Sequence, residues 1–572
     1  MRNRGILWAG VSCVLASGMM AGVAVAAPAN DDWSGATPIT ALPFTDTVAD
    51  IETATESATD PVIDCVYQGD HAQGDDSVWY AYTTGANDEF VDVSAAGYDT
   101  QLSVFGGAPE TGFVGVRGGC NDDGVGVGGN SRIFGLRLRA NTRYSFLVAN
   151  YSLNSPPSST LAFSLQRSAV YAVTKTDDTS DGICDADCSL RDAIAASATP
   201  GAIVLPAGTF ALSGGAKVLT GGAWYGAGMD RTIIDGQGVS RLVTLASDTH
   251  YDTFALHDLT LANGRAPDGD ATGGRGGALY SAAREVIALD RVAVRGSVAA
   301  GSGGGIYVIG NLKVQDSVFS GNLSQSSGGG IAVAGWTFDI ERTAIVGNEA
   351  RAAPSQPTTF SGGGGGLYTD LRYGARISNT TISGNRTAGE AAALIRTFRY
   401  YMNIHISNSS IVDNDIGVLD DMSQQGGLKI DNTDGGMLFR PVQITHTVIA
   451  GNRPATAPER SADCVITSRV TIATRYNLVQ VPQGCGFAGE GDVTGIDPQL
   501  EPLDTSLVIP APRPAPGSPL IDAGDPAGGC ERTDARGVVR PLDGNGDGVA
   551  RCDIGAIEVE VDGIFKDSFE AR

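Results

Sequence analysis

Basic residues are scarce in this chain of 572 residues, which holds 39 Lys and Arg against 64 Asp and Glu. The formal net charge at pH 7 is therefore −25. A surface of this sign repels the phosphates of nucleic acids, so the composition argues against nucleic acid as a partner. It suits a protein that stays soluble outside the cell and that meets divalent cations there.

Long apolar runs are also lacking after the N-terminus, where no segment approaches the roughly 20 residues of a membrane span. The run from Ile6 to Val25 follows Arg2 and Arg4, and Ala24-Val25-Ala26 is a small-x-small cleavage site. A transmembrane anchor is the alternative, but strong hydrophobes are few in this run. We predict a signal peptide over 1–26, and no transmembrane span in the mature chain.

No two cysteines form a CxxC pair, and the five histidines are scattered, which argues against a metal cluster. Removal of Cys13 with the signal peptide leaves eight cysteines, an even number in an oxidising compartment. Proximity within the expected domains favours four disulfides. The pairs are Cys65–Cys120, Cys184–Cys188, Cys464–Cys485 and Cys530–Cys552.

Helical periodicity is missing too, and Gly contributes 78 residues, which is typical of an all-β chain with many turns. Short period-two segments over 27–168 predict an N-terminal β-sandwich. This part resembles the pre-peptidase C-terminal type of sandwich appended to secreted bacterial proteins. The matching features are Asn30-Asp-Asp-Trp, Ser77-Val-Trp-Tyr, Tyr98-Asp-Thr and Cys120-Asn-Asp-Asp. The resemblance implies an accessory or binding module without catalysis.

An irregular repeat fills 250–452. Its anchors are Asn263, Gly296, Asn322, Asn348, Asn385, Asn414 and Asn452, separated by 26 to 38 residues. Ten and eight positions before each anchor lie two mostly apolar columns, to which Ala255 and Ala288 belong, with a polar residue between them. This alternation indicates strands with one buried face, and the variable intervals indicate loops at a corner. We predict a right-handed, single-stranded parallel β-helix over 201–494.

Two flanking segments resemble known motifs. Cys188-Ser-Leu-Arg-Asp resembles the CSLREA motif that opens many bacterial β-helices, with Asp192 in place of Glu. Ser189 and Asp192 approximate a capping box, so we expect a helical cap over 169–200 that covers the first coil.

The region 495–558 resembles the choice-of-anchor Q region of bacterial surface proteins. The resemblance rests on Asp497-Pro-Gln-Leu, Pro516-Gly-Ser-Pro, Asp534-Ala-Arg-Gly and Cys552-Asp-Ile-Gly, in that order. The tail 559–572 contains Gly563-Ile-Phe-Lys-Asp-Ser-Phe-Glu, which is similar to the endings of some exported proteobacterial proteins. Both resemblances imply export or display.

A structural role is the first interpretation of polar residues that stack along a β-helix. Asn side chains at one bend can satisfy the turn backbone and each other. Six positions before the anchors, Asp290 and Asp316 should be near neighbours, and such a carboxylate pair can hydrolyse glycosides. A second polar stack is the alternative, because Asn, Arg and His occupy the same column. Gly-His-Gly and Arg-Ile-Lys, the signatures of pectin hydrolases, are absent, so we assign no catalytic residue.

A tyrosine stripe is the candidate binding surface. Tyr307 and Tyr368 follow the inward residues Ile306 and Leu367 and should point outward, and Tyr280 falls near the same corner. Exposed aromatic rings in register can stack on sugars. Ordinary packing under the adjoining loops is the alternative.

Asp543-Gly-Asn-Gly-Asp-Gly matches the first half of an EF-hand loop, so Asp543, Asn545 and Asp547 are candidate calcium ligands. The twelfth position is Ile554, and the neighbouring Asp553 is the possible substitute for the missing Glu. Tight glycine turns held by a disulfide are the alternative.

The favoured interpretation is a secreted or surface-displayed, non-catalytic β-helix protein that acts in adhesion or glycan binding. A polysaccharide lyase or glycoside hydrolase, and a purely structural surface protein, are the alternatives. We expect a location outside a Gram-negative cell or on its outer surface, and a polysaccharide or cell-surface glycan as the partner. No cofactor is expected to be required, and calcium is the one candidate.

Overall fold

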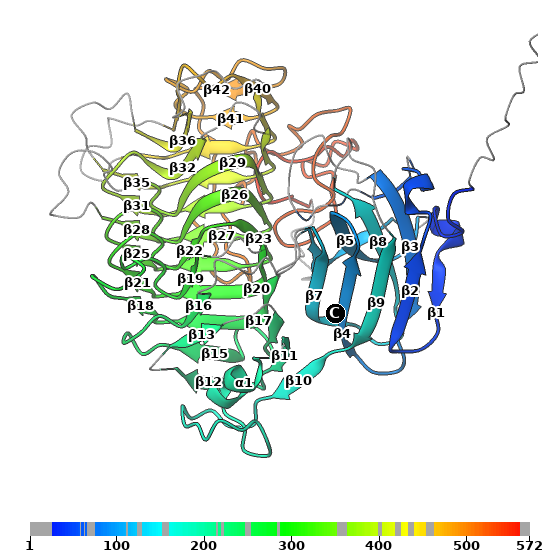
Figure 1. Ribbon diagram of the computed structural model, residues 1–572. Coiled ribbons are helices and arrows are strands. Elements are labelled where there is room, and N and C mark those ends of the chain that lie inside the picture. The colour runs from blue at the N-terminus through cyan, green and yellow to red at the C-terminus, as the bar shows by residue number, and fades with distance from the viewer. Residues whose placement is uncertain are drawn as a thin grey trace, which may run out of the picture.

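The computed structural model describes most of the chain after residue 25 and contains two β-rich bodies (Figure 1). The described ranges are 26–57, 59–61, 63, 65, 75–109, 112–122, 129–151, 160–198, 200–212, 215–218, 222–245, 253–282, 286–351, 363–397, 403–417, 425–432, 440–453 and 463–560. The signal-peptide prediction and the tail from 561 onward lie outside these residues. None of the described helices is long and apolar enough to cross a membrane.

The N-terminal body is a β-sandwich of a five-stranded and a four-stranded sheet. The first sheet contains β1 (Thr37–Ile39), β3 (Asp75–Thr83), β8 (Arg143–Asn150), β5 (Thr100–Gly106) and β6 (Val114–Asn121). The second contains β2 (Phe44–Val48), β9 (Leu161–Arg167), β4 (Glu89–Ala96) and β7 (Ser131–Leu138). Short 3-10 turns span Trp33–Gly35 and Ile51–Thr53. Between the sheets, Tyr80 stacks on Phe163 with ring centroids 3.9 Å apart.

The second body is a parallel β-helix with three long faces, which confirms the predicted fold class. Face one holds β10 (Ala169–Ala172), β11 (Gly201–Val204), β14 (Gly222–Tyr225), β17 (Phe254–Ala262), β20 (Val286–Arg295), β23 (Asn311–Gln315), β26 (Ile331–Glu341), β29 (Leu367–Ser378), β33 (Asn403–Ser407), β37 (Val442–Thr445) and β40 (Ile472–Arg475). β17 and β20 continue around the bend into face two, whereas β26 and β29 begin on face three.

Face two adds β12 (Gly208–Ala211), β15 (Thr232–Asp235), β24 (Val318–Ser320), β27 (Ala344–Val346), β30 (Thr381–Ser383), β34 (Ser410–Val412), β38 (Val448–Ala450), β41 (Leu478–Val479) and β42 (Val493–Thr494). Face three adds β13 (Ala216–Val218), β16 (Val243–Leu245), β19 (Leu279–Ser281), β22 (Ile306–Val308), β32 (Ala391–Thr397), β36 (Gly426–Asn432) and β39 (Cys464–Ile466). A six-stranded sheet of two-residue strands lies between faces two and three. It contains β18 (Arg265–Ala266), β21 (Val298–Ala299), β25 (Leu323–Ser324), β28 (Glu349–Ala350), β31 (Arg386–Thr387) and β35 (Asp415–Ile416).

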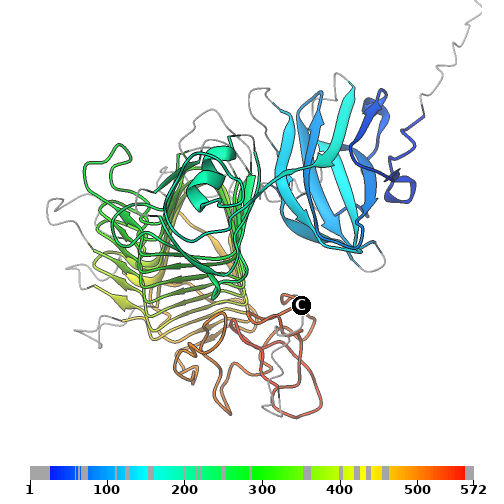
Figure 2. The same cartoon turned by 90° about the horizontal axis from the view of Figure 1, so that it is seen from below.

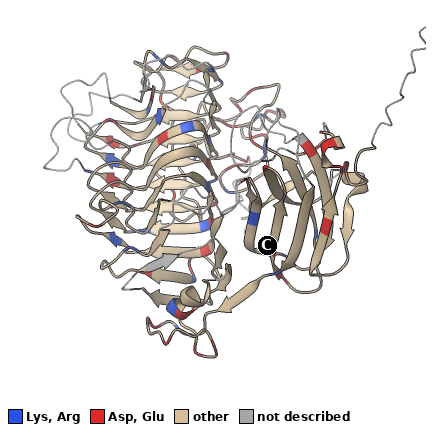
Figure 3. Ribbon diagram, in the orientation of Figure 1, with Lys and Arg blue, Asp and Glu red and all other residues tan. Residues whose placement is uncertain are grey.

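Charges of alternating sign follow this short-strand sheet. Glu349, Arg386 and Asp415 lie in register on successive strands, and Arg386 pairs with Asp415 at 3.3 Å. Figure 3 shows the resulting alternation of red and blue along the outer edge of the β-helix. Cross-strand pairs of opposite charge stabilise a register, whereas like charges in the same places would oppose it.

The Asn column is a hydrogen-bonded ladder. The Nδ2 and backbone N–H of Asn348 both donate to Oδ1 of Asn385, at 3.0 Å each, and Nδ2 also donates to the Phe319 carbonyl at 2.9 Å. The same arrangement holds at Asn322, Asn385, Asn414 and Asn452. These bonds satisfy buried donors at the bend, which is the structural role predicted for the column.

Two of the predicted anchors are wrong by one residue. Asn263 and Gly296 are left-handed residues in the position that Gly321 takes before Asn322. Ser297 is the residue equivalent to Asn322, since its backbone N–H donates to Oδ1 of Asn322 at 3.0 Å. The inward residues of these coils are therefore Leu256 and Leu289, and Ala255 and Ala288 point outward.

The bend between faces one and two uses a column of left-handed residues, here named the bend column. Its members have φ between 43° and 57°. They are Asp258, Arg291, Asp316, Arg342, Asn379, Asn408, His446 and Tyr476. His257 and Asp290, which the sequence placed in this column, belong to the strands just before it.

A short helix closes the N-terminal end of the β-helix. α1 (Leu190–Ala196) begins at Ser189, which forms a full capping box with Asp192, and Leu190 and Ala193 pack on the first coils. Figure 2 shows α1 lying over the open end of the stack. Burial alone would raise the pKa of Asp192, but hydrogen bonds from Ser180 and Ser189 hold that pKa well below its usual range. Within the expected cap, 169–172 is instead the first strand of face one.

All four predicted disulfides are present: Cys65–Cys120, Cys184–Cys188, Cys464–Cys485 and Cys530–Cys552. The C-terminal region 495–558 forms loops along the β-helix and pairs only through isolated bridges among the described residues. A fully buried ion pair between Arg540 and Glu558, at 2.8 Å, holds these loops together. Arg536 and Asp534 form a second buried pair at 2.6 Å.

Candidate functional site

The sandwich docks on a stripe of alanines on face one. Ala202, Ala223, Ala255 and Ala288 lie in register on successive coils and form one buried cluster with Tyr225. Tyr225 donates to the Gly135 carbonyl of β7 at 3.0 Å. The small side chains allow the sandwich to approach face one closely. The stripe of alanines ends at Ala288, and Lys313 takes the next outward position.

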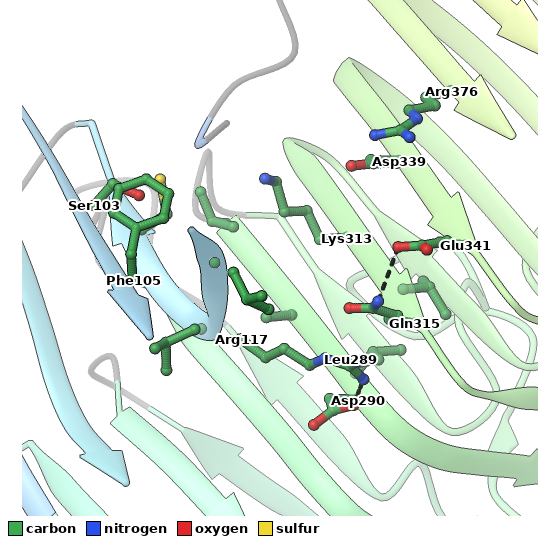
Figure 4. A pocket seen from close by; sticks show the side chains of 18 of the residues that line it. Ser103, Phe105, Arg117, Leu289, Asp290, Lys313, Gln315, Asp339, Glu341 and Arg376 are labelled. Carbon is green, nitrogen blue, oxygen red and sulfur yellow. Dashed lines mark hydrogen bonds and ion pairs between the residues drawn. The ribbon is translucent and has the colours of Figure 1, made fainter. Parts of the chain in front are cut away.

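A cleft of about 430 Å³ opens at this point between the two bodies. Figure 4 shows Lys313, Asp339 and Arg376 on neighbouring strands of face one, opposite Phe105 of the sandwich. Domain junctions are common places for ligand sites, and this volume lies within the roughly 300–1,000 Å³ typical of them. The cleft is therefore the larger of two candidate sites.

Charged groups within the cleft satisfy one another. Arg117 of β6 donates to both Asp290 and Asp316, which brings the two carboxylates together as expected. Asp290 also forms a hydrogen bond with His257, with Nδ1 of the imidazole 3.3 Å from Oδ2 of the carboxylate. Burial would raise the pKa of Asp290, but His257 and Arg117 hold it well below its usual range. Glycoside hydrolysis needs one carboxyl with a raised pKa as the proton donor, and Asp290 does not fill that role.

The remaining cleft residues are also engaged. Glu341 receives Gln315 at 2.8 Å and pairs with Arg342, and burial raises the pKa of this Glu. Arg376 pairs with Glu531 of the C-terminal region at 3.4 Å. Three separate parts of the chain thus meet in the cleft through internal ion pairs. This arrangement is typical of a domain junction that fixes its neighbours in place.

The tyrosine stripe is in register on face three, but its first two rings are not exposed. Tyr280, Tyr307, Ala332 and Tyr368 are register partners on four successive coils, in that order. Tyr280 and Tyr307 are only 9 % and 7 % exposed, because they stack on each other at 5.8 Å beneath Arg241 and Arg275. These two rings lie outside the inner core, but they are packed under neighbouring side chains, which was the alternative to an exposed stripe.

A cavity of about 210 Å³, here named the tyrosine cavity, lies where the stripe is interrupted at Ala332. Tyr307 and Tyr368 line it from the coils on either side, and Tyr280 does not reach it. The other polar lining residues are Asp370, Arg396, Arg275, Ser302, Ser326 and Ser327. Two predicted residues thus meet in one cavity with charged groups that the sequence did not single out.

Asp370 is the least satisfied group in the tyrosine cavity. It lies two residues after Tyr368 on β29, so both side chains point outward, and Arg396 is its register partner on β32. Its Oδ1 atom is buried and has no hydrogen-bond partner among the described residues. Burial raises the pKa of Asp370 to about 6, although Arg396 and Arg372 act against this. The sequence could have indicated Asp370, because residues two apart on a strand share a face and Tyr368 was expected to point outward.

The two arginines of the tyrosine cavity lie against its rings. Arg275 is exposed, and its guanidinium lies 5.1 Å from the Tyr307 centroid. No described residue forms an ion pair with Arg275. Arg396 lies 6.0 Å from the Tyr368 centroid and donates to Glu390 at 3.0 Å. The cavity therefore combines aromatic faces with donors and one unsatisfied carboxyl, the groups that sugar recognition requires.

The candidate calcium loop is organised by its own backbone. Asp543 accepts from the amides of Gly546 and Gly548 at 2.7 and 2.8 Å. Asp547 accepts from Val549 at 2.8 Å. The carboxylate of Asp553 is turned away from the loop, since its oxygens accept from Asp522 and Val559, and burial raises its pKa.

No described group of three or more His, Cys, Asp or Glu side chains could hold a metal ion. The loop around Asp543 and Asn545 can still use backbone carbonyls, so calcium binding there stays a prediction. A calcium titration followed by thermal unfolding tests it, with D543N as the variant that should lose any rise in Tm.

No protein-family model matches the chain, and no curated protein matches it. Among solved structures, the A-module of the mannuronan C-5 epimerase AlgE6 from Azotobacter vinelandii is 15 % identical, with a TM-score of 0.22. The match covers 57 % of this chain and 96 % of that one. A GH87 alpha-1,3-glucanase from Streptomyces thermodiastaticus is 13 % identical over 78 % of this chain and 91 % of that one, with a TM-score of 0.22. Scores this low carry no argument about activity, and the fold rests on the strand pairing described above.

Proposed function

We propose that this chain is an exported, non-catalytic β-helix protein that binds glycans, in adhesion or at the surface of a Gram-negative cell. The observation that carries the proposal is the tyrosine cavity, which places Tyr307, Tyr368, Asp370 and Arg396 around one space. Its volume, about 210 Å³, is below that of pockets for drug-sized molecules and suits a single sugar ring of a longer chain. The four disulfides fit a location outside the cell.

Binding is favoured over hydrolysis because Asp370 is the sole carboxyl among the cavity residues that the structure describes. Glycosidases ordinarily use two carboxyl groups flanking the scissile bond. A screen of polysaccharides for released reducing ends or unsaturated products addresses the alternative of a lyase or hydrolase. Release of either product would replace the binding proposal.

The test is retention of the full chain on a glycan array, compared with two tyrosine variants. Y368A removes a lining ring and should abolish retention. Y373A is the matched control, because Tyr373 lies on the same strand, is 37 % exposed and does not line the cavity. Equal retention of Y368A and the unaltered chain would reject the tyrosine cavity as the site. No retention on any glycan would favour the structural alternative.

A further inference from the structure

We infer that the tyrosine cavity selects a sugar unit bearing a carboxylate, a uronic acid within a glycan chain. The inference rests on the proposed glycan binding and narrows its ligand. Its first support is local charge. Two guanidinium groups, of Arg275 and Arg396, line the cavity against one carboxyl, of Asp370, in a chain whose net charge is −25. Arg396 is already paired with Glu390, so Arg275 is the guanidinium that attracts an anionic group to the cavity.

Arg275 provides the most direct contact for such a group. Its guanidinium stacks above Tyr307 and remains exposed, with its donors uncommitted to any described carboxylate. A planar guanidinium matches a planar carboxylate through two parallel hydrogen bonds, which gives geometric preference as well as attraction. The Tyr368 ring supplies an apolar face for the ring of the same sugar, whereas Tyr307 is covered by Tyr280 and Arg275.

Asp370 adds a donor when it is protonated. The groups that face it are Tyr368 and Arg372 on its own strand, Arg396 on β32 and Tyr307 on β22. Ala334, its register partner on β26, contributes no charge. Protonated Asp370 can donate through the atom that now lacks a partner, whereas ionised Asp370 repels a ligand carboxylate.

This arrangement fixes the sign of the pH dependence. Because the pKa of Asp370 is raised to about 6, the side chain loses its proton as the pH rises through that value. Affinity for an acidic sugar should therefore fall between about pH 5 and pH 7. A neutral sugar should show little change over the same range.

The experiment is calorimetric titration of the full chain with oligogalacturonate, and with the same oligosaccharide after reduction of its carboxyl groups to alcohols. At pH 5.5 we expect the acidic form to bind at least about tenfold more tightly. R275Q should remove most of that difference, because it deletes the guanidinium that the ligand carboxylate would meet. D370N should keep acidic binding and make it independent of pH.

The results distinguish selection of acidic sugars from glycan binding in general. Equal affinity for both oligosaccharides, with Y368A abolishing both, would overturn acid selection and keep glycan binding. Equal binding of a sulfated oligosaccharide would also overturn carboxylate selection. Binding of neither ligand would overturn the inference, and the glycan-binding proposal would fall with it only if the glycan array also shows no retention. R275Q alters an exposed side chain, so a folded variant is expected, and circular dichroism checks this.

Discussion

Single residues of the bend column hold the flanking parts of the chain. Toward the N-terminal end, Asp258 pairs with Arg137 of the sandwich at 3.0 Å. Further along, Oδ1 of Asn408 accepts from the Glu531 amide at 3.0 Å, and Nε2 of His446 accepts from the Asp525 amide at 3.1 Å. Left-handed backbone turns these side chains outward, and Asn, Asp and His adopt it more readily than most residues.

His446 makes the docking of the C-terminal region sensitive to acid. Burial, together with Arg540 and Arg475, lowers the pKa of His446 to about 4. Its unfolded pKa is near 6.5, so on acidification the unfolded state takes up the proton first and stability falls. We expect a loss of about 2 kcal/mol between pH 7 and pH 5.

H446N isolates this effect, because Asn408 shows that Asn fits the same column and accepts the same kind of bond. Urea unfolding of both proteins at pH 7 and pH 5 is the measurement. The variant should retain the stability that the unaltered chain loses. An identical loss in both would place the acid sensitivity elsewhere.

The sequence revealed most of the residues that build the fold, but not their burial. Period-two columns identified the faces, yet Ala255 and Ala288 look like inward residues because the docked sandwich makes their outward position apolar. An alanine that points inward and an alanine that points outward under a docked domain cannot be told apart from the sequence. The predicted register of these two coils was therefore wrong by one residue. Tyr280 and Tyr307 were found by alternation, but their cover, Arg241 and Arg275, comes from corners that sequence spacing does not place.

At the scale of elements, the Asn ladder ties each coil to the next. Asn348 is fully buried and takes part in five hydrogen bonds across coils, three as donor and two as acceptor. Replacement by Ala leaves the Phe319 carbonyl and the Asn322 backbone amide without these partners, and each orphaned group costs about 1–3 kcal/mol.

We therefore expect N348A to lower the free energy of unfolding by about 2–4 kcal/mol. Chemical denaturation measures the change. N87A is the control, since Asn87 is an exposed sandwich residue and its replacement should change stability little. Similar values for the two variants would show that the ladder contributes nothing specific.

On the scale of the whole molecule, Arg117 joins the sandwich to two coils at once through Asp290 and Asp316. Its removal leaves Asp290 with His257 and Arg291, and Asp316 with Arg342. Both carboxylates therefore stay paired within the β-helix. R117Q should thus loosen the junction while both bodies remain folded.

Small-angle scattering should show a larger radius of gyration for R117Q, and circular dichroism should be unchanged. R139Q is the matched control, because Arg139 is 57 % exposed and pairs within the sandwich with Asp88. An unchanged radius for R117Q would mean that the alanine stripe, Tyr225 and the Arg137–Asp258 pair hold the two bodies without Arg117.

The last rung of the Asn ladder shows how such a series is closed. The side-chain amide of each ladder Asn donates to the next member of the ladder. Each Asn therefore needs a residue with an acceptor oxygen in the next position. Asp463 accepts from Asn452 through Oδ1 and from the Val481 amide through Oδ2. An ionised carboxylate has no donor to pass on, so Asp463 terminates the series. The length of the ladder is in this sense set by one side chain, while β40, β41 and β42 extend the stack beyond it. Any attempt to lengthen the ladder would begin by replacing Asp463 with Asn.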